Sequence, residues 1–259
     1  SIIFVLLTKI QLQMDVLLVF ALVILVPFLG ALATFFTGFG LNTILVPVFM
    51  IYWDAPLAVL MAGIVHLCNN ILKVALTARS INWNLFRNFG LPALFFAFIG
   101  ANILNDLTFT RGSQMKPVFG IILIIFALLE LFKWKLPLSG PWALRVGGSL
   151  SGFFGGFSGH QGALRALFLS QLKLNPLVFV ATTAIISLLV DLTRVGVYFS
   201  SSWFDRFDPS YFMFLGVPSA LIGTLIGKKY IQKMNHQYLS VVVGAALLLM
   251  GVLLFFGLI

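Results

Sequence analysis

The sequence is poor in charged residues. Asp, Glu, Lys and Arg make up only 9% of its 259 residues, whereas 61% are apolar, and the mean hydropathy is +1.09. A soluble globular domain carries roughly a quarter charged residues, because its surface must face water. The composition therefore excludes a soluble domain and predicts an all-α integral membrane protein whose main solvent is lipid.

Cysteine and the common catalytic motifs are also scarce or missing. Cys68, the single cysteine, excludes an internal disulfide and any metal site built from several cysteines. The sequence has no His-Glu-x-x-His zinc motif, no Gly-x-Ser-x-Gly elbow, no phosphate-binding loop and no paired acids within its apolar runs. We expect no catalytic residues, no metal and no cofactor, which argues against an intramembrane enzyme and against a nucleotide-driven pump.

Long apolar runs fill most of the chain. Their lengths fit membrane-spanning helices of about 20 residues, and because they are continuous rather than alternating they do not predict strands. After an N-terminal segment, 1–14, to which we assign no function, the predicted helices are 15–36, 56–78, 85–104, 117–132, 143–154, 176–199, 211–226 and 239–258. Two further runs, 43–53 and 162–172, are too short to cross alone.

The chain repeats itself once. Residues 35–40 (Phe-Phe-Thr-Gly-Phe-Gly) correspond to 153–158 (Phe-Phe-Gly-Gly-Phe-Ser), and each is followed by a short apolar run and then a proline, Pro56 or Pro176. Three more landmarks follow in the same order: 70–74 with 191–195, 90–93 with 216–219, and 119–120 with 243–244. Transporters are often duplicated halves. We predict repeats at 15–134 and 135–259 in one membrane domain.

The position of the basic residues favours inverted repeats. Each repeat is predicted as a broken, re-entrant helical hairpin, 15–54 or 140–173, followed by three transmembrane helices, so the second repeat has the opposite orientation. One face then collects Arg79, Arg87, Lys133, Lys135, Arg145, Lys173, Lys228, Lys229 and Lys233. Cytoplasmic loops collect Lys and Arg, whereas a parallel arrangement would scatter these residues over both faces. We therefore predict a multi-pass protein of the cell (inner or plasma) membrane with both termini extracytoplasmic. We interpret the net charge of +9 as a topology signal rather than as a sign of nucleic-acid binding.

Glycine-rich breaks interrupt both hairpins. Unpaired backbone groups in lipid cost several kcal/mol each, so each break must line a cavity within the protein. The short helix after each break directs free N–H groups and partial positive charge to the middle of the membrane, where an anion would be stabilised. The predicted substrate-binding residues in these breaks are Gly38, Gly40, Asn42, Thr43, Ser158, Gly159, His160 and Gln161.

Ionisable residues near the breaks add to this prediction. Arg165 lies just inside the second short helix, where it would fork onto an oxyanion; the alternative is a structural arginine that clamps backbone carbonyls. Asp191 and Arg194 are three residues apart on one helix and are expected to pair. With His66 and Asn70 they are our candidates for coupling or gating, and His160 and Asp191 are the candidate proton carriers. Lys73 corresponds to Arg194 and lies near enough to a helix end to snorkel.

Taken with these residues, a first helix that ends in Gly-x-Gly before a proline, repeated in the second half, resembles the TauE/SafE sulfite exporter family, also called the toluene sulfonate uptake permease family. The resemblance covers about residues 30–259 and includes the paired Gly-x-Pro segments at 90–92 and 216–218. It implies transport of sulfite, a sulfonate or a related anion. The chain departs from the usual glycine runs at Leu41 and Asn42 and at Ser158, His160 and Gln161.

These observations predict a secondary transporter, and an exporter by the resemblance, of a small sulfur oxyanion bound at mid-membrane between the two broken hairpins. The alternative is an anion channel, which needs the same pore chemistry but no alternating access. The expected partners are the anionic substrate and the lipid bilayer, with proton coupling as a hypothesis.

Overall fold

Apolar helices make up the computed structural model, which describes residues 2–34, 41–111, 115–132, 140–200, 210–230 and 236–259. No strand occurs among these residues, which confirms the all-helical prediction. The elements are α1 (Ile2–Thr34), α2 (Leu41–Phe49), α3 (Ala55–Thr77), η1 (Ala78–Ser80), α4 (Trp83–Leu85), η2 (Phe86–Gly90), α5 (Leu91–Arg111), α6 (Lys116–Phe132), α7 (Gly140–Ser158), α8 (Gly162–Leu169), η4 (Ser170–Leu172), α9 (Pro176–Phe199), α10 (Ser210–Tyr230) and α11 (His236–Phe255).

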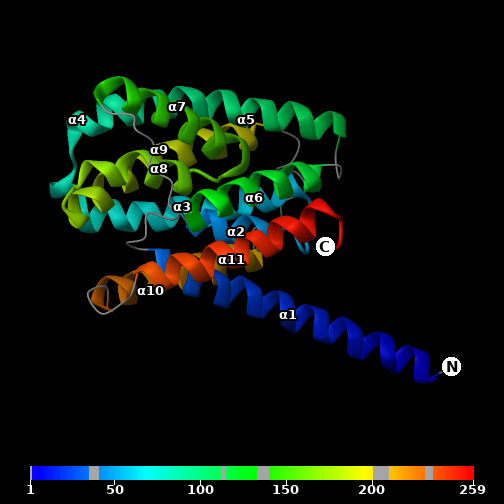
Figure 1. Ribbon diagram of the computed structural model, residues 1–259. Coiled ribbons are helices and arrows are strands. Elements are labelled where there is room, and N and C mark those ends of the chain that lie inside the picture. Colours follow the sequence, from blue (N-terminus) through cyan, green and yellow to red (C-terminus); the bar gives the residue numbers. More distant parts are fainter. Residues whose placement is uncertain (1, 35–40, 112–114, 133–139, 201–209, 231–235) are drawn as a thin grey trace.

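Four helices are long and apolar enough to cross a membrane, judged by length and composition within the described residues. They are Leu17–Thr34, Ala55–Ser80, Trp83–Leu107 and Pro176–Phe199. The first differs from the prediction at its start, because α1 begins at Ile2 and so includes most of the segment 1–14 in one helix. In Figure 1 the N-terminal part of α1 extends beyond the other helices.

A proline lies in the first turn of the long helix that follows each short helix. Pro56 lies in the first turn of α3, and Pro176 opens α9, where the missing N–H of proline costs no helical hydrogen bond. Asn175 caps α9, because its side-chain oxygen accepts a hydrogen bond of 2.9 Å from the backbone N–H of Leu177. The proline that marks this point in both halves of the sequence therefore marks the start of a long helix in both.

Each half begins with a helical hairpin. α2 folds back against α1, and α8 folds back against α7. In the first hairpin Gly30 lies against the side chain of Leu41, and in the second Gly147 lies against the ring of Phe168. Among the described residues, a longer helix therefore packs on a short one at the start of each half, α1 on α2 and α7 on α8.

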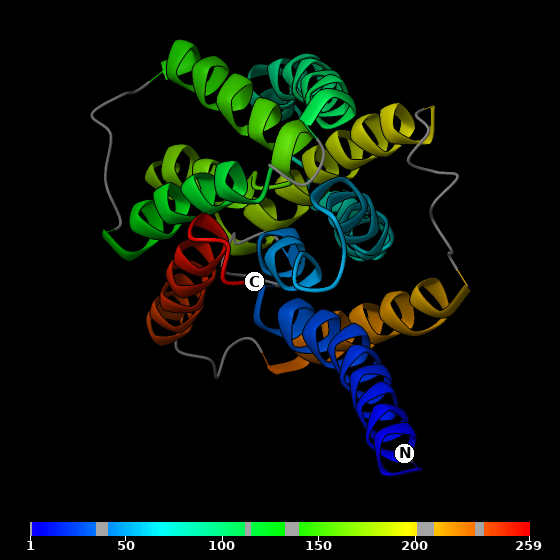
Figure 2. The ribbon, with the colours of Figure 1, turned by 90° about the vertical axis from the view of Figure 1, so that its right-hand side faces the viewer.

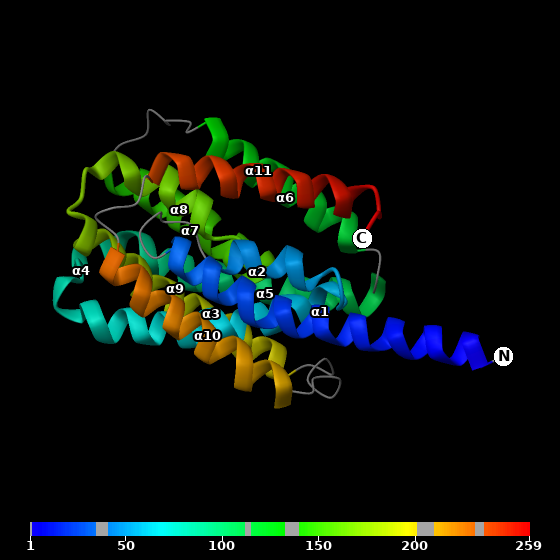
Figure 3. The ribbon, with the colours of Figure 1, turned by 90° about the horizontal axis from the view of Figure 1, so that it is seen from below.

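The two halves exchange contacts in matched pairs. α5 packs on α7 while α10 packs on α1, and α5 packs on α9 while α10 packs on α3. α3 and α9, which occupy the same place in the two halves, pack on each other, as do α6 and α11. Figure 2 shows α2 near the middle of the molecule, with α1 and α10 on one side and α5 and α7 on the other, and Figure 3 shows α6 beside α11.

Corresponding helices run in opposite directions. Along α3 and α9, Gly63 lies against Arg194 whereas His66, further along α3, lies against Asp191, which is earlier in α9. Residue numbers therefore rise along one helix as they fall along the other, and α3 and α9 are antiparallel.

The same holds for α6 and α11. Gly120 near the start of α6 meets Gly251 near the end of α11, and Gly244 near the start of α11 meets Leu131 near the end of α6. This second pair of corresponding helices is antiparallel as well.

Glycines allow α7 to approach η2 and α5 closely and in parallel. Gly148 of α7 lies against the backbone of η2 at Phe89, and Gly152 and Gly156 lie against the backbone of α5 at Ala93 and Ala97, with both numbers rising by four. A Cβ at any of the three glycines would overlap a carbonyl oxygen of η2 or α5. Small residues spaced by four bring backbones together in this way in membrane helices.

Candidate functional site

A buried acid and base meet where α3 crosses α9. The Nδ1 of His66 lies 2.6 Å from Oδ2 of Asp191, and the amide of Asn70 donates to the same oxygen at 3.0 Å. His66 and Asn70 are each 2% exposed and Asp191 is fully enclosed. Asp191 is the only carboxylate among the buried residues of the described part of the chain.

Arg194 completes this cluster from the next turn of α9. Its Nε donates to Oδ1 of Asp191 at 3.0 Å, and its Nη2 lies 2.8 Å from the same oxygen, which confirms the predicted pair. Gly63 of α3 makes room for the guanidinium, since a Cβ there would stand 3.3 Å from Cζ. Nη1 of Arg194 has no hydrogen-bond partner within the described residues.

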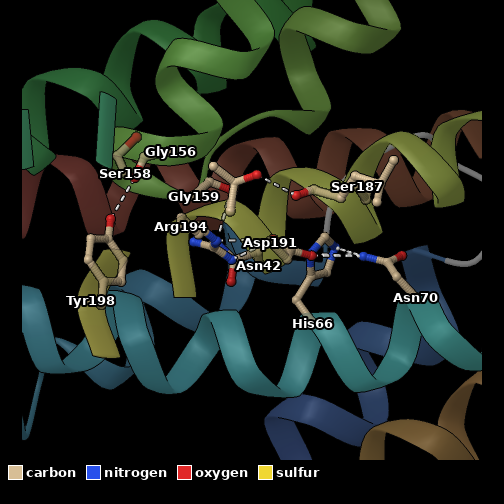
Figure 4. A network of polar contacts seen from close by, with 12 residues as sticks. Asn42, His66, Asn70, Gly156, Ser158, Gly159, Ser187, Asp191, Arg194 and Tyr198 are labelled. Carbon is tan, nitrogen blue, oxygen red and sulfur yellow. Dashed lines mark hydrogen bonds and ion pairs between the residues drawn. The ribbon is translucent and has the colours of Figure 1, made fainter. Parts of the chain in front are cut away.

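The second break and the start of α2 lie beside that free nitrogen. Gly159 has a φ of +78°, a left-handed conformation that favours glycine. The amide of Asn42 donates to the carbonyl of Gly159 at 2.9 Å. A Cβ at Gly159 would stand 2.6 Å from Nη1 of Arg194 and would overlap the Asn42 amide. The hairpins of the two halves therefore touch at the point where Arg194 of α9 ends (Figure 4).

Arg165 of α8 reaches a different turn of α9. Its Nη1 donates to the carbonyl of Thr183 at 2.8 Å and to the hydroxyl of Ser187 at 2.5 Å. Its Nε and Nη2 have no partner in the described structure, although the residue is only 3% exposed. The arginine thus clamps one backbone carbonyl, as the alternative reading expects, and still holds unpaired donors.

The remaining polar residues of the breaks are buried as well. His160 is 1% exposed and its ring stacks near Phe126, with 6.1 Å between ring centroids. Both ring nitrogens of His160, both amide atoms of Gln161 and the hydroxyl of Thr43 have no partner among the described residues. The hydroxyl of Ser158 donates to a carbonyl of its own helix at 3.1 Å. Gly38 and Gly40 lie outside the described residues.

Other residues of this region do not follow from the sequence argument. The hydroxyl of Tyr198 donates to the carbonyl of Gly156 at 2.5 Å, and Thr224 of α10 donates to Asn69 of α3 at 2.5 Å. For Ser187, which contacts Arg165, the sequence did contain a signal, because Ser187 lies one turn before Asp191 on the same face of α9. Lys73 is 6% exposed, so protein encloses its side chain instead of leaving it to snorkel.

The buried charges do not balance. Arg165, Arg194 and Lys73 contribute three positive charges and Asp191 contributes one negative charge, which leaves 3 − 1 = +2 on these four buried residues. Buried charge is expensive unless it is paired. Such a site attracts anions. Among the described residues no three His, Cys, Asp or Glu side chains gather closely enough to hold a metal ion.

The comparisons with known proteins place the chain in a family. The family model described as sulfite exporter TauE/SafE matches residues 21–254, which is most of the sequence. No curated protein and no solved structure matches the chain. A family of exporters agrees with the prediction of a membrane transporter rather than an enzyme. Residue pattern, helical architecture and family match together lead to one conclusion: the chain belongs to the TauE/SafE sulfite exporter family.

Proposed function

We propose that the protein is a secondary transporter, and by its family an exporter, of a small anion: sulfite, a sulfonate or a related sulfur oxyanion. The observation that carries the proposal is the pair of buried arginines, whose guanidinium groups keep three unpaired nitrogens at Arg165 and Arg194 close to the touching hairpins. A guanidinium binds a planar or tetrahedral oxyanion through parallel N–H bonds. The family match supports a sulfur oxyanion as the substrate class.

The hairpins supply the rest of the proposed binding site. The amides of Asn42 and Gln161, the hydroxyl of Thr43 and the ring of His160 are buried and keep unpaired polar atoms. Together with the backbone N–H groups at the starts of α2 and α8 they can surround an anion without water. The anion would thus bind between elements of both halves.

We also propose that the halves are inverted repeats with both termini outside. Two observations support this arrangement: the halves carry the same order of elements, and the corresponding pairs α3 and α9 and α6 and α11 are antiparallel. A two-fold axis in the membrane plane reverses corresponding helices, whereas an axis along the membrane normal would leave them parallel. A reporter domain fused after Ile259 should be active outside the cytoplasm, and a cytoplasmic reporter would refute this topology.

The transport function is tested with two matched arginine variants. In proteoliposomes, labelled sulfite should enter against an internal pool of unlabelled sulfite, and this counterflow should saturate. Arg165→Gln removes charge-assisted hydrogen bonds worth about 1.5–3 kcal/mol, so the half-saturating sulfite concentration should rise roughly 10–150-fold. Arg145→Gln changes an exposed arginine of α7 and should leave counterflow unchanged.

The outcomes separate the candidate functions. Equal counterflow in Arg165→Gln and wild-type protein, with both folded, would remove this arginine from the site. Absence of counterflow for sulfite, thiosulfate, sulfoacetate and taurine in the wild-type protein would contradict the transporter. An ohmic anion current without counterflow would favour the anion channel.

A further inference from the structure

We infer that the His66–Asp191 pair carries a proton that moves together with the anion, in the same direction. The inference rests on the proposed function and adds the identity of the coupled ion and of the residues that bind it. The geometry of the pair, its position in the fold and its contact with Arg194 each support it.

The position of the pair suits a coupling site. It lies between α3 and α9, the corresponding long helices of the two halves, so one residue comes from each half. Any movement of α3 against α9 has to change the contact of 2.6 Å that joins them. A proton bound here is therefore sensitive to the conformation of the transporter.

The chemistry of the pair allows one proton to bind and leave. With Nδ1 of His66 donating its N–H to Oδ2 of Asp191, the other ring nitrogen, Nε2, has a lone pair that takes a proton, and no covalent bond is broken elsewhere. The charge of the pair then changes from −1 to 0. Asp191 remains a carboxylate in both states, and the Asn70 amide donates to it in both states.

Arg194 connects the proton to the anion. Its Nε and Nη2 lie on Asp191, while its unpaired Nη1 points to Gly159 and Asn42, at the proposed anion site. Without the proton, the pair and Arg194 together are neutral; with it, they carry one positive charge. The added charge draws an anion to Nη1, and by reciprocity the bound anion favours the proton. Both ligands therefore bind together and are carried together.

Other charged and titratable groups from α3, α8, α9 and the second break interact electrostatically with the cluster of His66, Asp191 and Arg194. Arg194 of α9 and Lys73 of α3 act on His66, and Arg165 of α8 faces Asp191. His160 of the second break and Tyr198 of α9 interact electrostatically with Arg194. Apart from Asp191 and the phenol of Tyr198, these groups are basic, so the carboxylate is the group that sets the balance between proton and anion.

Two variants of α3 separate proton binding from hydrogen bonding. His66→Gln removes the titratable ring but keeps an amide that can donate to Asp191, whereas Asn70→Ala removes a donor and no titratable group. Proton entry is measured during net sulfite uptake into sulfite-free proteoliposomes with a pH-sensitive dye inside. Anion exchange is measured separately, as counterflow of labelled sulfite against an internal pool, in which the entering and leaving protons cancel. Sulfite itself binds protons near neutral pH, and this contribution scales with the sulfite taken up, so proton entry is compared between variants per sulfite taken up.

We expect proton entry with sulfite in the wild-type protein and in Asn70→Ala. His66→Gln should lose at least nine-tenths of the protein-dependent proton entry per sulfite taken up, and its half-saturating sulfite concentration in counterflow should rise, because no proton can then draw the anion to Nη1 of Arg194. Three results would overturn the inference: wild-type net sulfite uptake without proton entry, unchanged proton entry per sulfite taken up in His66→Gln, or the same loss of proton entry in both variants. The proposed function fails on a different result, the absence of counterflow in the wild-type protein.

Discussion

Replacing Gly152 by alanine should increase the distance between α5 and α7 and destabilise the protein. A Cβ at Gly152 would stand 2.5 Å from the Cα of Ala93 and 2.6 Å from its carbonyl carbon, whereas ordinary contacts lie at 3.4–4 Å. The carbonyl oxygen of Ala93 lies nearer still, so the helices must separate by at least 3.4 − 2.5 = 0.9 Å at this point. Because the obstacle is backbone, no rotamer change can relieve it, and the overpacking cost should reach about 3 kcal/mol.

A gain in helix propensity offsets part of this cost. Alanine is about 1 kcal/mol better than glycine inside a helix, so the net loss in the free energy of unfolding for Gly152→Ala is about 2 kcal/mol. Gly196→Ala is the matched control, because a Cβ at this exposed position of α9 would meet nothing within 4 Å. It should gain up to about 1 kcal/mol. The two variants should thus differ by about 3 kcal/mol.

Thermal unfolding of the purified protein in detergent measures this difference. At roughly 2–4 °C per kcal/mol for a chain of this size, Gly152→Ala should melt roughly 6–12 °C below Gly196→Ala. A melting temperature for Gly152→Ala equal to or above that of Gly196→Ala would show that α7 and α5 do not touch through this glycine, and the argument for the close parallel pair would be lost.

Two further substitutions test the contacts of the second break. Tyr198→Phe removes the hydrogen bond to the carbonyl of Gly156 and should lower the free energy of unfolding by about 0.5–1.5 kcal/mol in chemical denaturation, with sulfite counterflow retained; no change in stability would contradict this bond. Gly159→Ala should abolish counterflow, because the new Cβ would displace Arg194. Gly257→Ala is the control, since Gly257 also has a positive φ, +65°, but a Cβ there would meet nothing within 4 Å. Its backbone strain should cost about the same, roughly 1–2 kcal/mol, and it should transport normally. Equal counterflow in these two glycine variants would refute the proposed role of the break.

Much of the fold follows from the sequence, because lipid simplifies the problem. Backbone groups in lipid have to pair within helices, so continuous apolar runs predict helices, and Pro56 and Pro176 locate two of their starts. The start of α1 was harder to predict, since residues 2–14 are also rich in apolar residues and contain no proline to mark a boundary.

The candidate site followed less directly. Spacing within one helix predicts the Asp191–Arg194 pair, since residues three apart share a face. Contacts between helices, such as His66 with Asp191 or Asn42 with Gly159, depend on how helices far apart in sequence are packed, which no local pattern records. Single-helix reasoning therefore identified the participants but not their partners, and it missed Tyr198 and Thr224 altogether.

The exchange of helices between halves determines which parts can move as one piece. Glycines of α7 pack it closely along η2 and α5, and Gly223 and Gly227 of α10 pack that helix closely along α1 in the same way. Neither half of the sequence can therefore move as a rigid body of its own. A rocking transporter with this architecture has to swing composite bodies, each assembled from segments of both halves. Cutting the chain between α6 and α7 would therefore yield two fragments that stay packed on each other rather than two independent domains.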